Sequence, residues 1–351
     1  MKCDARKGKI QTVLGPIDPA QLGITLVHEH LMSDGTGWFV EPQDSFEKAM
    51  AYKPVTVDIL WWLTYHRFTN IDDLMCMDED EAVEEIAHFK LAGGHSIVEM
   101  SNTGLGRSPK ALARISRRSG LNVVMGSGYY IDCSLPDDMD DRSEQQITEE
   151  IVRDIDEGVG TTGICAGLIG EIGCTWPLSD NERKSLRAAG KAQKITGAAL
   201  NIHPGQHEDS AMQAVRIVEE AGADLTKTTM DHIDRAVRER DNRIALAKMG
   251  LYLEYDLFGR EGYYPLEHRK IDLPNDHIRI NEIMDLMDLG YTKQIVISQD
   301  IWNKTQRRAY GGWGYAHIMD NVLPVMRSKG LTDADIKTIM VDNPARLFAF
   351  A

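Results

Sequence analysis

The chain has 351 residues, of which 42% are hydrophobic and 26% are charged, and its formal net charge is -15. This composition is that of a globular protein that can bury a large core. The acidic balance argues against nucleic acid or an anionic membrane surface as the main partner, because both require a basic face. The length fits either two average domains or one large α/β barrel.

The N-terminal sequence and the cysteines point to the cytoplasm. The opening MKCDARKGKIQ lacks the apolar core of a signal peptide, and no stretch approaches the length of a membrane span. The five cysteines are scattered and have no CxxC spacing, which is typical of reduced thiols. We therefore expect a cytoplasmic protein.

Eight strand-like runs, bounded by turn residues, follow one another along the chain. They cover 24–30, 96–101, 122–130, 166–173, 198–204, 227–234, 250–256 and 294–300. Helical periodicity marks segments between them, at 78–94, 143–158, 179–197 and 241–250. Eight apolar strands that alternate with helices favour a closed (β/α)8 TIM barrel. An open doubly wound sheet is the alternative, although no glycine-rich phosphate loop follows the first strand.

No linker, low-complexity tract or internal repeat divides the chain, which predicts a single domain over 1–351. The connection 31–95, between the first two strands, is its main insertion. Segment 55–68 within it is predicted to be a helix. Trp61 and Trp62 in that helix could pack in a core, or could form a lid or a dimer face.

Metal-ligand side chains stand at the C-terminal ends of the predicted strands, where a barrel of this kind carries its active site. In ITLVHEH, His28 and His30 share one face of the strand while Glu29 points away. Alone, this pair fits histidines that are merely hydrogen-bonded to backbone equally well. The other strand ends supply four further ligand candidates, namely Glu171, His203, His232 and Asp300.

Six protein ligands exceed what one tetrahedral catalytic metal needs, and they predict two divalent ions bridged by a carboxylate and a hydroxide. Glu171 is the expected bridge, because a carboxylate has two oxygens to share. We assign one group to each ion: His28, His30 and Asp300 to the first, His203 and His232 to the second. Asp300 is the predicted catalytic residue, since it can take the hydroxide's proton and pass it to the leaving group. Zinc is the expected metal, with Mn, Co or Fe as alternatives.

These strand-end residues resemble the amidohydrolase superfamily, and more closely its phosphotriesterase family. The opening GKIQTVLGPIDPAQLGITLVHEHL is similar to that family's N-terminus. Later segments of the chain resemble the phosphotriesterase-related proteins of the family, namely GLIGEIGCTWPL, NIHPG and LYLEYDLFG. The resemblance covers nearly the whole chain. It implies a TIM barrel, a metal-dependent hydrolase and, as is common in the family, a homodimer.

One departure from the family concerns the bridge. True phosphotriesterases bridge their metals with a carboxylated lysine, whereas LIGEIG offers no lysine and Glu171 sits one position later. A shift of one residue would send the side chain to the opposite face of a regular strand. We therefore predict that a bulge at Gly170 turns Glu171 inward, and that activity needs no bicarbonate.

The resemblance implies hydrolysis of an acyl carbon, in an N-acyl amide such as an N-acyl amino acid or N-acetyltaurine, or in a lactone or ester. A phosphotriester or phosphoester hydrolase is one alternative. A non-catalytic small-molecule-binding relative is another, and the retained ligand set argues against it.

Several residues near the predicted site fit an anionic small-molecule substrate. Lys304 and Arg307 could meet its carboxylate or sulfonate, or could simply begin a surface helix. Tyr129 and Tyr130 could line the leaving-group side, or could cap the barrel core.

Two carboxylates lie on the seventh predicted strand. Glu254 and Asp256 could orient the metal-binding histidines, or could pair with Arg260.

Overall fold

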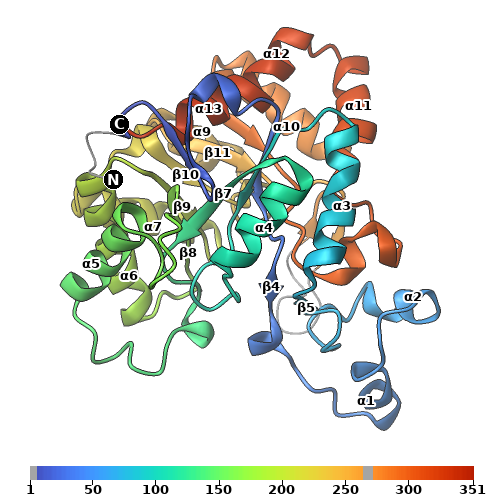
Figure 1. The fold of residues 1–351 in the computed structure, drawn as a ribbon. Helices are drawn as coiled ribbons and strands as arrows, with labels where there is room; N and C mark the ends of the chain where they lie inside the picture. The colour runs from blue at the N-terminus through green and yellow to red at the C-terminus, as the bar shows by residue number, and fades with distance from the viewer. Residues whose placement is uncertain (1–5, 264–271) are drawn as a thin grey trace.

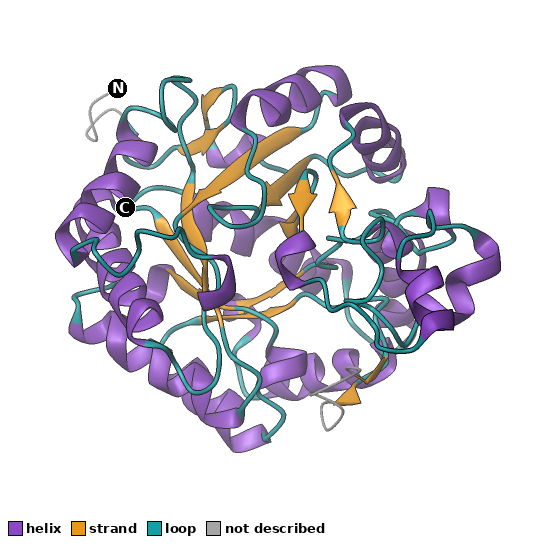
Figure 2. Cartoon of the chain, turned by 90° about the horizontal axis from the view of Figure 1, so that it is seen from below, coloured by secondary structure: helices purple, strands orange, loops and turns teal. Residues whose placement is uncertain are grey.

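The structure is a computed structural model that describes residues 6–263 and 272–351. Eight parallel strands curve into a nearly closed barrel, and helices surround it (Figures 1 and 2). All eight predicted strands and the predicted (β/α)8 TIM barrel are therefore confirmed. In sheet order the strands are β3 (Thr25–Glu29), β6 (Ser96–Glu99), β7 (Asn122–Ser127), β8 (Leu168–Gly173), β9 (Ala199–His203), β10 (Thr228–Met230), β11 (Tyr252–Tyr255) and β14 (Ile295–Ile297).

The four predicted helical segments correspond to α3 (Glu79–Leu91), α5 (Glu144–Asp156), α6 (Asp180–Thr196) and α9 (Arg240–Lys248). Helix α6 begins at a capping box between Ser179 and Glu182, and it ends at Gly197 with φ +70°. The other helices around the barrel are α4 (Pro109–Ser119), α7 (Glu208–Glu220), α8 (Ile233–Ala236), α10 (Asp276–Asp288), α11 (Leu323–Ser328), α12 (Asp333–Lys337) and α13 (Asn343–Phe348).

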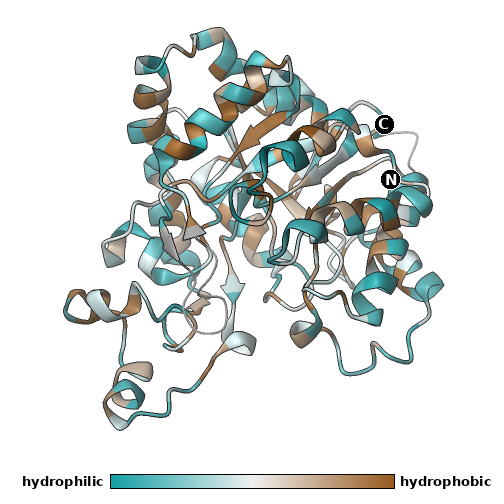
Figure 3. Ribbon diagram, turned by 180° about the vertical axis from the view of Figure 1, so that it is seen from behind, coloured by the Kyte–Doolittle hydropathy of each residue, from teal (hydrophilic) through white to brown (hydrophobic). Residues whose placement is uncertain are grey.

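Two hydrophobic layers hold the barrel together. The larger lies between the strands and the helices, and the smaller fills the barrel interior with side chains such as Val27, Val98 and Val124. In Figure 3 the outer helices carry both hydrophobic and hydrophilic residues, as expected for helices that pack one face against the barrel. The hairpin of β1 (Ile10–Thr12) and β2 (Gly15–Ile17) adds Ile10 to the interior layer at the N-terminal ends of the strands.

The sheet closes where β3 meets β14. The amide of Asp300 donates to the carbonyl of His28 (3.2 Å), and the amide of His30 donates to the carbonyl of Ile301 (3.1 Å). Glu29, which points away from the cavity as predicted, accepts from the Ser298 hydroxyl at 2.8 Å. This seam therefore fixes the ends of the first and last barrel strands against each other.

Most of the insertion 31–95 forms a lobe that projects from the barrel, and its last helix, α3, lies beside α4 on the barrel (Figure 1). The lobe contains β4 (Ser33–Asp34), β5 (Met75–Cys76), α1 (Ser45–Ala51) and α2 (Leu60–Leu63). The prediction of one helix over 55–68 was wrong in extent: a 3-10 turn at Val57–Ile59 and α2 form, and the chain then turns so that Phe68 pairs with Val40 through its carbonyl (2.9 Å).

The two tryptophans of the lobe differ in environment. Trp62 packs in the small core of the lobe, whereas Trp61 is 63% exposed. A short antiparallel pair, β12 (Gly262–Tyr263) and β13 (Asp272–Leu273), precedes α10. In the part of the chain that the structure describes, no helix is long and apolar enough to cross a membrane.

Candidate metal centre and active-site cavity

The six predicted metal ligands converge at the C-terminal end of the barrel, and all six are buried. The residues are His28 in β3, His30 just after it, Glu171 in β8, His203 at the end of β9, His232 beyond β10 and Asp300 beyond β14. Among the described non-glycine residues, His232 (φ +49°) and Asp300 (φ +50°) are the ones with positive φ. Such conformations are uncommon and cluster at functional sites, where the surrounding structure holds them in place.

A bulge in β8 turns Glu171 into the barrel, as predicted. Ile169 pairs with Leu200 and Ile172 with Ile202, so β8 carries one extra residue between the two pairs. Gly170 adopts φ +138°, a conformation that favours glycine, and its peptide bond to Glu171 is cis. A residue with a side chain would not fit there, because an added Cβ would lie 2.8 Å from Cβ of Asn201.

The carboxylate of Glu171 lies between two pairs of histidines. Its Oε1 is 3.3 Å from Nε2 of His30 and 3.6 Å from Nε2 of His28. Its Oε2 is 2.7 Å from Nδ1 of His203 and 3.7 Å from Nε2 of His232. One oxygen therefore faces each pair, which is the placement a bridging ligand needs.

Asp300 lies close to the first pair of histidines, His28 and His30. Its Oδ1 lies 3.3 Å from Nε2 of His30 and 3.8 Å from Nε2 of His28. On its other side, Nη1 of buried Arg260 lies 3.2 Å from Oδ2, and Nη2 donates to the Asp300 carbonyl at 2.7 Å. Arg260 therefore pairs with Asp300, and the alternative pairing with Glu254 or Asp256 is not adopted.

Glu254 and Asp256 instead orient two of the histidines. Glu254 Oε1 lies 2.7 Å from Nδ1 of His28, and Asp256 Oδ1 lies 2.7 Å from Nδ1 of His232. A carboxylate that accepts the Nδ1 proton leaves Nε2 as the unprotonated nitrogen, and it makes that nitrogen a stronger metal ligand.

The carboxylates give the cluster a negative electrostatic field. Burial alone would lower the pKa of His30, but Asp300 and Glu171 raise it to about 9. Burial would also lower the pKa of His232, but Asp256 raises it to about 9. A field that stabilises positive charge on two buried imidazoles also favours a metal cation among them.

His203 and Glu171 are held in the protonation states that metal ligands require. Burial, His232 and Arg235 together lower the pKa of His203 to about 3, which keeps its ring neutral. Burial would raise the pKa of Glu171, but the charge of His28 and its contacts with His203 and His232 hold it well below its usual range. A neutral imidazole and an ionised carboxylate are the forms that bind metals.

Several observations fit a metal ion in this cluster. Ligand atoms of His28, His30 and Asp300 lie within 4.8 Å of one another. The buried Nε2 of His28 has no hydrogen-bond partner among the described residues, although its Nδ1 is engaged by Glu254. A buried nitrogen without a partner is costly unless something binds it. Imidazole and carboxylate donors suit Zn, Mn, Co or Fe.

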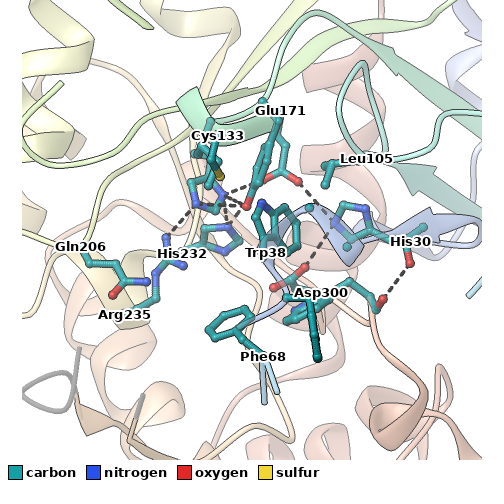
Figure 4. Close-up of a pocket in the computed structure, with 18 of the residues that line it drawn as sticks. His30, Trp38, Phe68, Leu105, Cys133, Glu171, Gln206, His232, Arg235 and Asp300 are labelled. Carbon is teal, nitrogen blue, oxygen red and sulfur yellow. Dashed lines mark hydrogen bonds and ion pairs between the residues drawn. The ribbon is translucent and has the colours of Figure 1, made fainter. Parts of the chain in front are cut away.

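A cavity of about 680 Å³ lies beside the ligand cluster (Figure 4). Five of the six predicted ligands line it, whereas the fully buried His28 does not. Tyr130 also lines the cavity, with its hydroxyl 3.3 Å from both ring nitrogens of His203. The rest of the wall is formed largely by the insertion after β3, through Gly35, Gly37, Trp38, Phe39, Val40 and Phe68.

Three residues that were predicted to bind substrate do not line the cavity. Lys304 pairs with Asp72 at 2.6 Å, and the fully buried Arg307 pairs with Glu81 at 2.6 Å. Both cations anchor the segment after β14 to the insertion. The third, Tyr129, accepts a hydrogen bond from Arg142 at 2.6 Å and packs in the core. Of the two tyrosines, only Tyr130 faces the ligands, because adjacent residues point to opposite sides.

Sequence reasoning missed several residues near the centre. Arg235 lines the cavity and lies 3.2 Å from His203. Its spacing of three residues from His232, at the start of α8, was a usable signal, since such residues share a helix face. Asp231 lies 3.6 Å from Nδ1 of His28. Trp38 could not be found from sequence, because it is brought to the cavity by an irregular segment.

The sequence matches the model of the Phosphotriesterase family over residues 8–348. The chain is 39% identical to N-acetyltaurine hydrolase of Xenopus tropicalis over 344 residues, which are 98% of either protein. A solved structure of a resiniferatoxin-binding protein from Rhodobacter sphaeroides has a TM-score of 0.94 at 38% identity, and the match covers 97% of this chain and 95% of that one.

A second solved structure is the phosphotriesterase homology protein from Escherichia coli, in complex with phosphate in its active site. Its TM-score is 0.77 at 27% identity, and the match covers 95% of this chain and 100% of that one. The family match over nearly the full length, together with a barrel whose strand ends gather histidines and carboxylates, places this chain in the phosphotriesterase family and makes it a hydrolase.

Proposed function

We propose that this chain is a binuclear metal-dependent hydrolase that attacks an acyl carbon with an activated water. The observation that carries the proposal is the position of Glu171, with one carboxylate oxygen facing each pair of histidines. His28, His30 and Asp300 would hold one ion, and His203 and His232 the other. Zinc is the first expectation for both ions, with Mn, Co or Fe as alternatives.

Bound divalent cations would supply acidity, by lowering the pKa of a coordinated water and polarising the substrate's carbonyl oxygen. Asp300 accepts the proton that the attacking water loses and delivers it to the leaving nitrogen as the C–N bond breaks. Arg260 fixes the orientation of Asp300 through its side chain and its carbonyl. Tyr130, whose hydroxyl lies at the cavity wall beside His203, can hydrogen-bond the substrate near its leaving group.

An N-acyl amide is our first candidate substrate, in the form of N-acetyltaurine or an N-acyl amino acid. The Xenopus relative, named N-acetyltaurine hydrolase, supports this choice because its identity of 39% extends over 98% of both chains. A lactone or ester is the next candidate, since the same attack on an acyl carbon applies. A phosphoester is the alternative, supported by the phosphate in the active site of the E. coli relative.

Metal analysis combined with substrate profiling tests the proposal. We expect the purified protein to carry two equivalents of divalent metal and to lose its activity when a chelator removes them. The highest kcat/KM is expected for an N-acyl amide, when N-acetyltaurine, N-acyl amino acids, lactones and a phosphotriester are compared. A phosphotriester or phosphoester turned over fastest would favour the alternative. Two bound metals without turnover of any compound would identify a binding protein instead.

A further inference from the structure

A continuous aromatic wall forms one side of the active-site cavity. The ring centroid of Trp38 lies 5.3 Å from that of Tyr130 and 5.6 Å from that of Trp302, and Phe68 stacks on Trp302 at 5.8 Å. All four side chains line the cavity. Trp38 and Phe68 are only half-buried, so apolar surface is left for a ligand to cover.

Beside His203 the cavity wall is polar and positively charged, unlike the aromatic wall. Arg235 is 6% exposed, lines the cavity and donates from Nη2 to the carbonyl of Pro204 at 2.9 Å. Gln206 lies next to it (Figure 4), and its buried Oε1 accepts no hydrogen bond from any described residue. A cation beside a carboxamide, whose NH2 group donates hydrogen bonds, suits a carboxylate or sulfonate.

The distances match a compact anionic headgroup close to the scissile bond. Nη2 of Arg235 lies 3.2 Å from Nε2 of His203, so the cation stands one side chain away from the ligand cluster. The headgroup of an N-acyl amino acid or N-acyl taurine is likewise only a few bonds from its amide. When the carbonyl of such a compound meets the ligand cluster and its headgroup meets Arg235, its acyl group is left to face the aromatic wall.

The cavity is much larger than an acetyl group requires. Its volume of about 680 Å³ lies in the range of sites that enclose drug-sized ligands. A single methyl group would leave most of the aromatic wall uncovered. An acyl chain of medium length, or an aromatic acyl group, would cover it.

We propose that this site takes amphiphilic anionic acyl amides, with the headgroup held by Arg235 and Gln206 and an extended acyl group held by the aromatic wall. The proposal rests on the proposed function for the position of the scissile carbonyl. It adds the substrate class: acyl amides with chains longer than acetyl are preferred, and the headgroup is a carboxylate or a sulfonate.

Binding to metal-free protein tests the substrate class without turnover. Cys133 lines the cavity and is exposed, so a bound ligand should protect it from alkylation, as measured by mass spectrometry of its peptide. The probes are N-acetyl and N-octanoyl forms of glycine and taurine, with octanamide as the neutral compound. Each buried methylene tightens binding by about threefold to fourfold, so we expect the octanoyl forms to protect at concentrations at least about 30-fold lower. The glycine and taurine series distinguish a carboxylate from a sulfonate preference.

Matched variants test headgroup binding and acyl-group binding separately. Arg235→Gln should weaken N-octanoylglycine binding by about 10- to 100-fold and leave octanamide binding unchanged, and Arg235→Lys should restore part of the loss. Lys304→Gln is the charge control, because Lys304 is paired with Asp72 outside the cavity. Trp38→Ala should reduce the octanoyl-to-acetyl ratio, whereas Trp61→Ala, in the exposed part of the lobe, should not.

The inference is overturned if acetyl and octanoyl compounds protect Cys133 equally, or if Arg235→Gln weakens octanamide as much as the anionic compounds. Turnover by the metal-loaded protein is measured separately. Ligands that bind as expected and remain uncleaved would contradict the proposed hydrolysis and leave the ligand class standing. Rapid hydrolysis of acetyl compounds without a gain from longer chains would support the hydrolase and refute the inference.

Discussion

Substituting Gly170 by alanine should disturb both the stability of the fold and the position of Glu171. The residue has φ +138°, and the new Cβ would lie 2.8 Å from both Cβ and the carbonyl oxygen of Asn201. A strained backbone conformation costs about 1–3 kcal/mol, and an overpacked site costs about the same again. Together they predict a loss of about 2–6 kcal/mol in the free energy of unfolding.

Gly290→Ala is the matched control. Gly290 also has a positive φ (+91°), but nothing lies within 4 Å of its added Cβ, so only the backbone strain of about 1–2 kcal/mol applies. Urea unfolding of both metal-free variants, followed by circular dichroism, gives the two losses, and elemental analysis gives the metal content. If Gly170→Ala costs no more than Gly290→Ala and keeps full metal occupancy, the bulge does not depend on this glycine and our account of Glu171 is wrong.

Three further predictions concern the bridge and two charged side chains. Because Glu171 needs no carboxylation, reconstitution of metal-free protein should give the same activity with and without bicarbonate, and activation by bicarbonate would contradict a glutamate bridge. Arg260→Gln should lower the free energy of unfolding by about 3–5 kcal/mol, because it leaves the buried charge of Asp300 unpaired. The control variant Arg240→Gln, at a half-exposed ion pair, should lower it by less than about 1 kcal/mol. Urea titrations measure both losses. Burial lowers the pKa of Lys227 from 10.5 to about 8, so the unfolded chain binds more protons between these values. The free energy of unfolding of the wild type should therefore rise by up to about 3 kcal/mol relative to that of Lys227→Met as the pH rises through this window. A difference in the free energy of unfolding that stays constant or falls with pH would refute this prediction.

The barrel and its ligand positions could be predicted because they depend on short-range regularities. Strand alternation sets which side chains share a face, and parallel strands bring their C-terminal ends to one side of the sheet. His28, His203 and His232 were found in this way. The bulge at Gly170 was predictable for a different reason: in a regular strand the predicted bridge Glu171 would face outward, and glycine allows the backbone that turns it inward.

The cavity wall could not be predicted because irregular segments build it. Trp38 and Phe68 reach the site through the insertion after β3, where no periodicity fixes the direction of a side chain. The same lack of regularity explains why Lys304 and Arg307 lie away from the cavity. Their spacing after Asp300 suggested proximity to the site, but Asp72 and Glu81 of the insertion compete for both cations. Local sequence carries no signal for partners more than 200 residues away.

The seam between β3 and β14 has a consequence for the order in which this protein can mature. The amide of His28 is bonded to the hydroxyl of Ser298, 270 positions later in the chain. His28 and His30 are made early during synthesis, whereas Asp300 emerges from the ribosome only after all eight barrel strands have been synthesised. An ion held by these three side chains would link the first and last strands of the sheet. Cofactor capture would then be one of the last steps of biogenesis, and it would follow closure of the barrel.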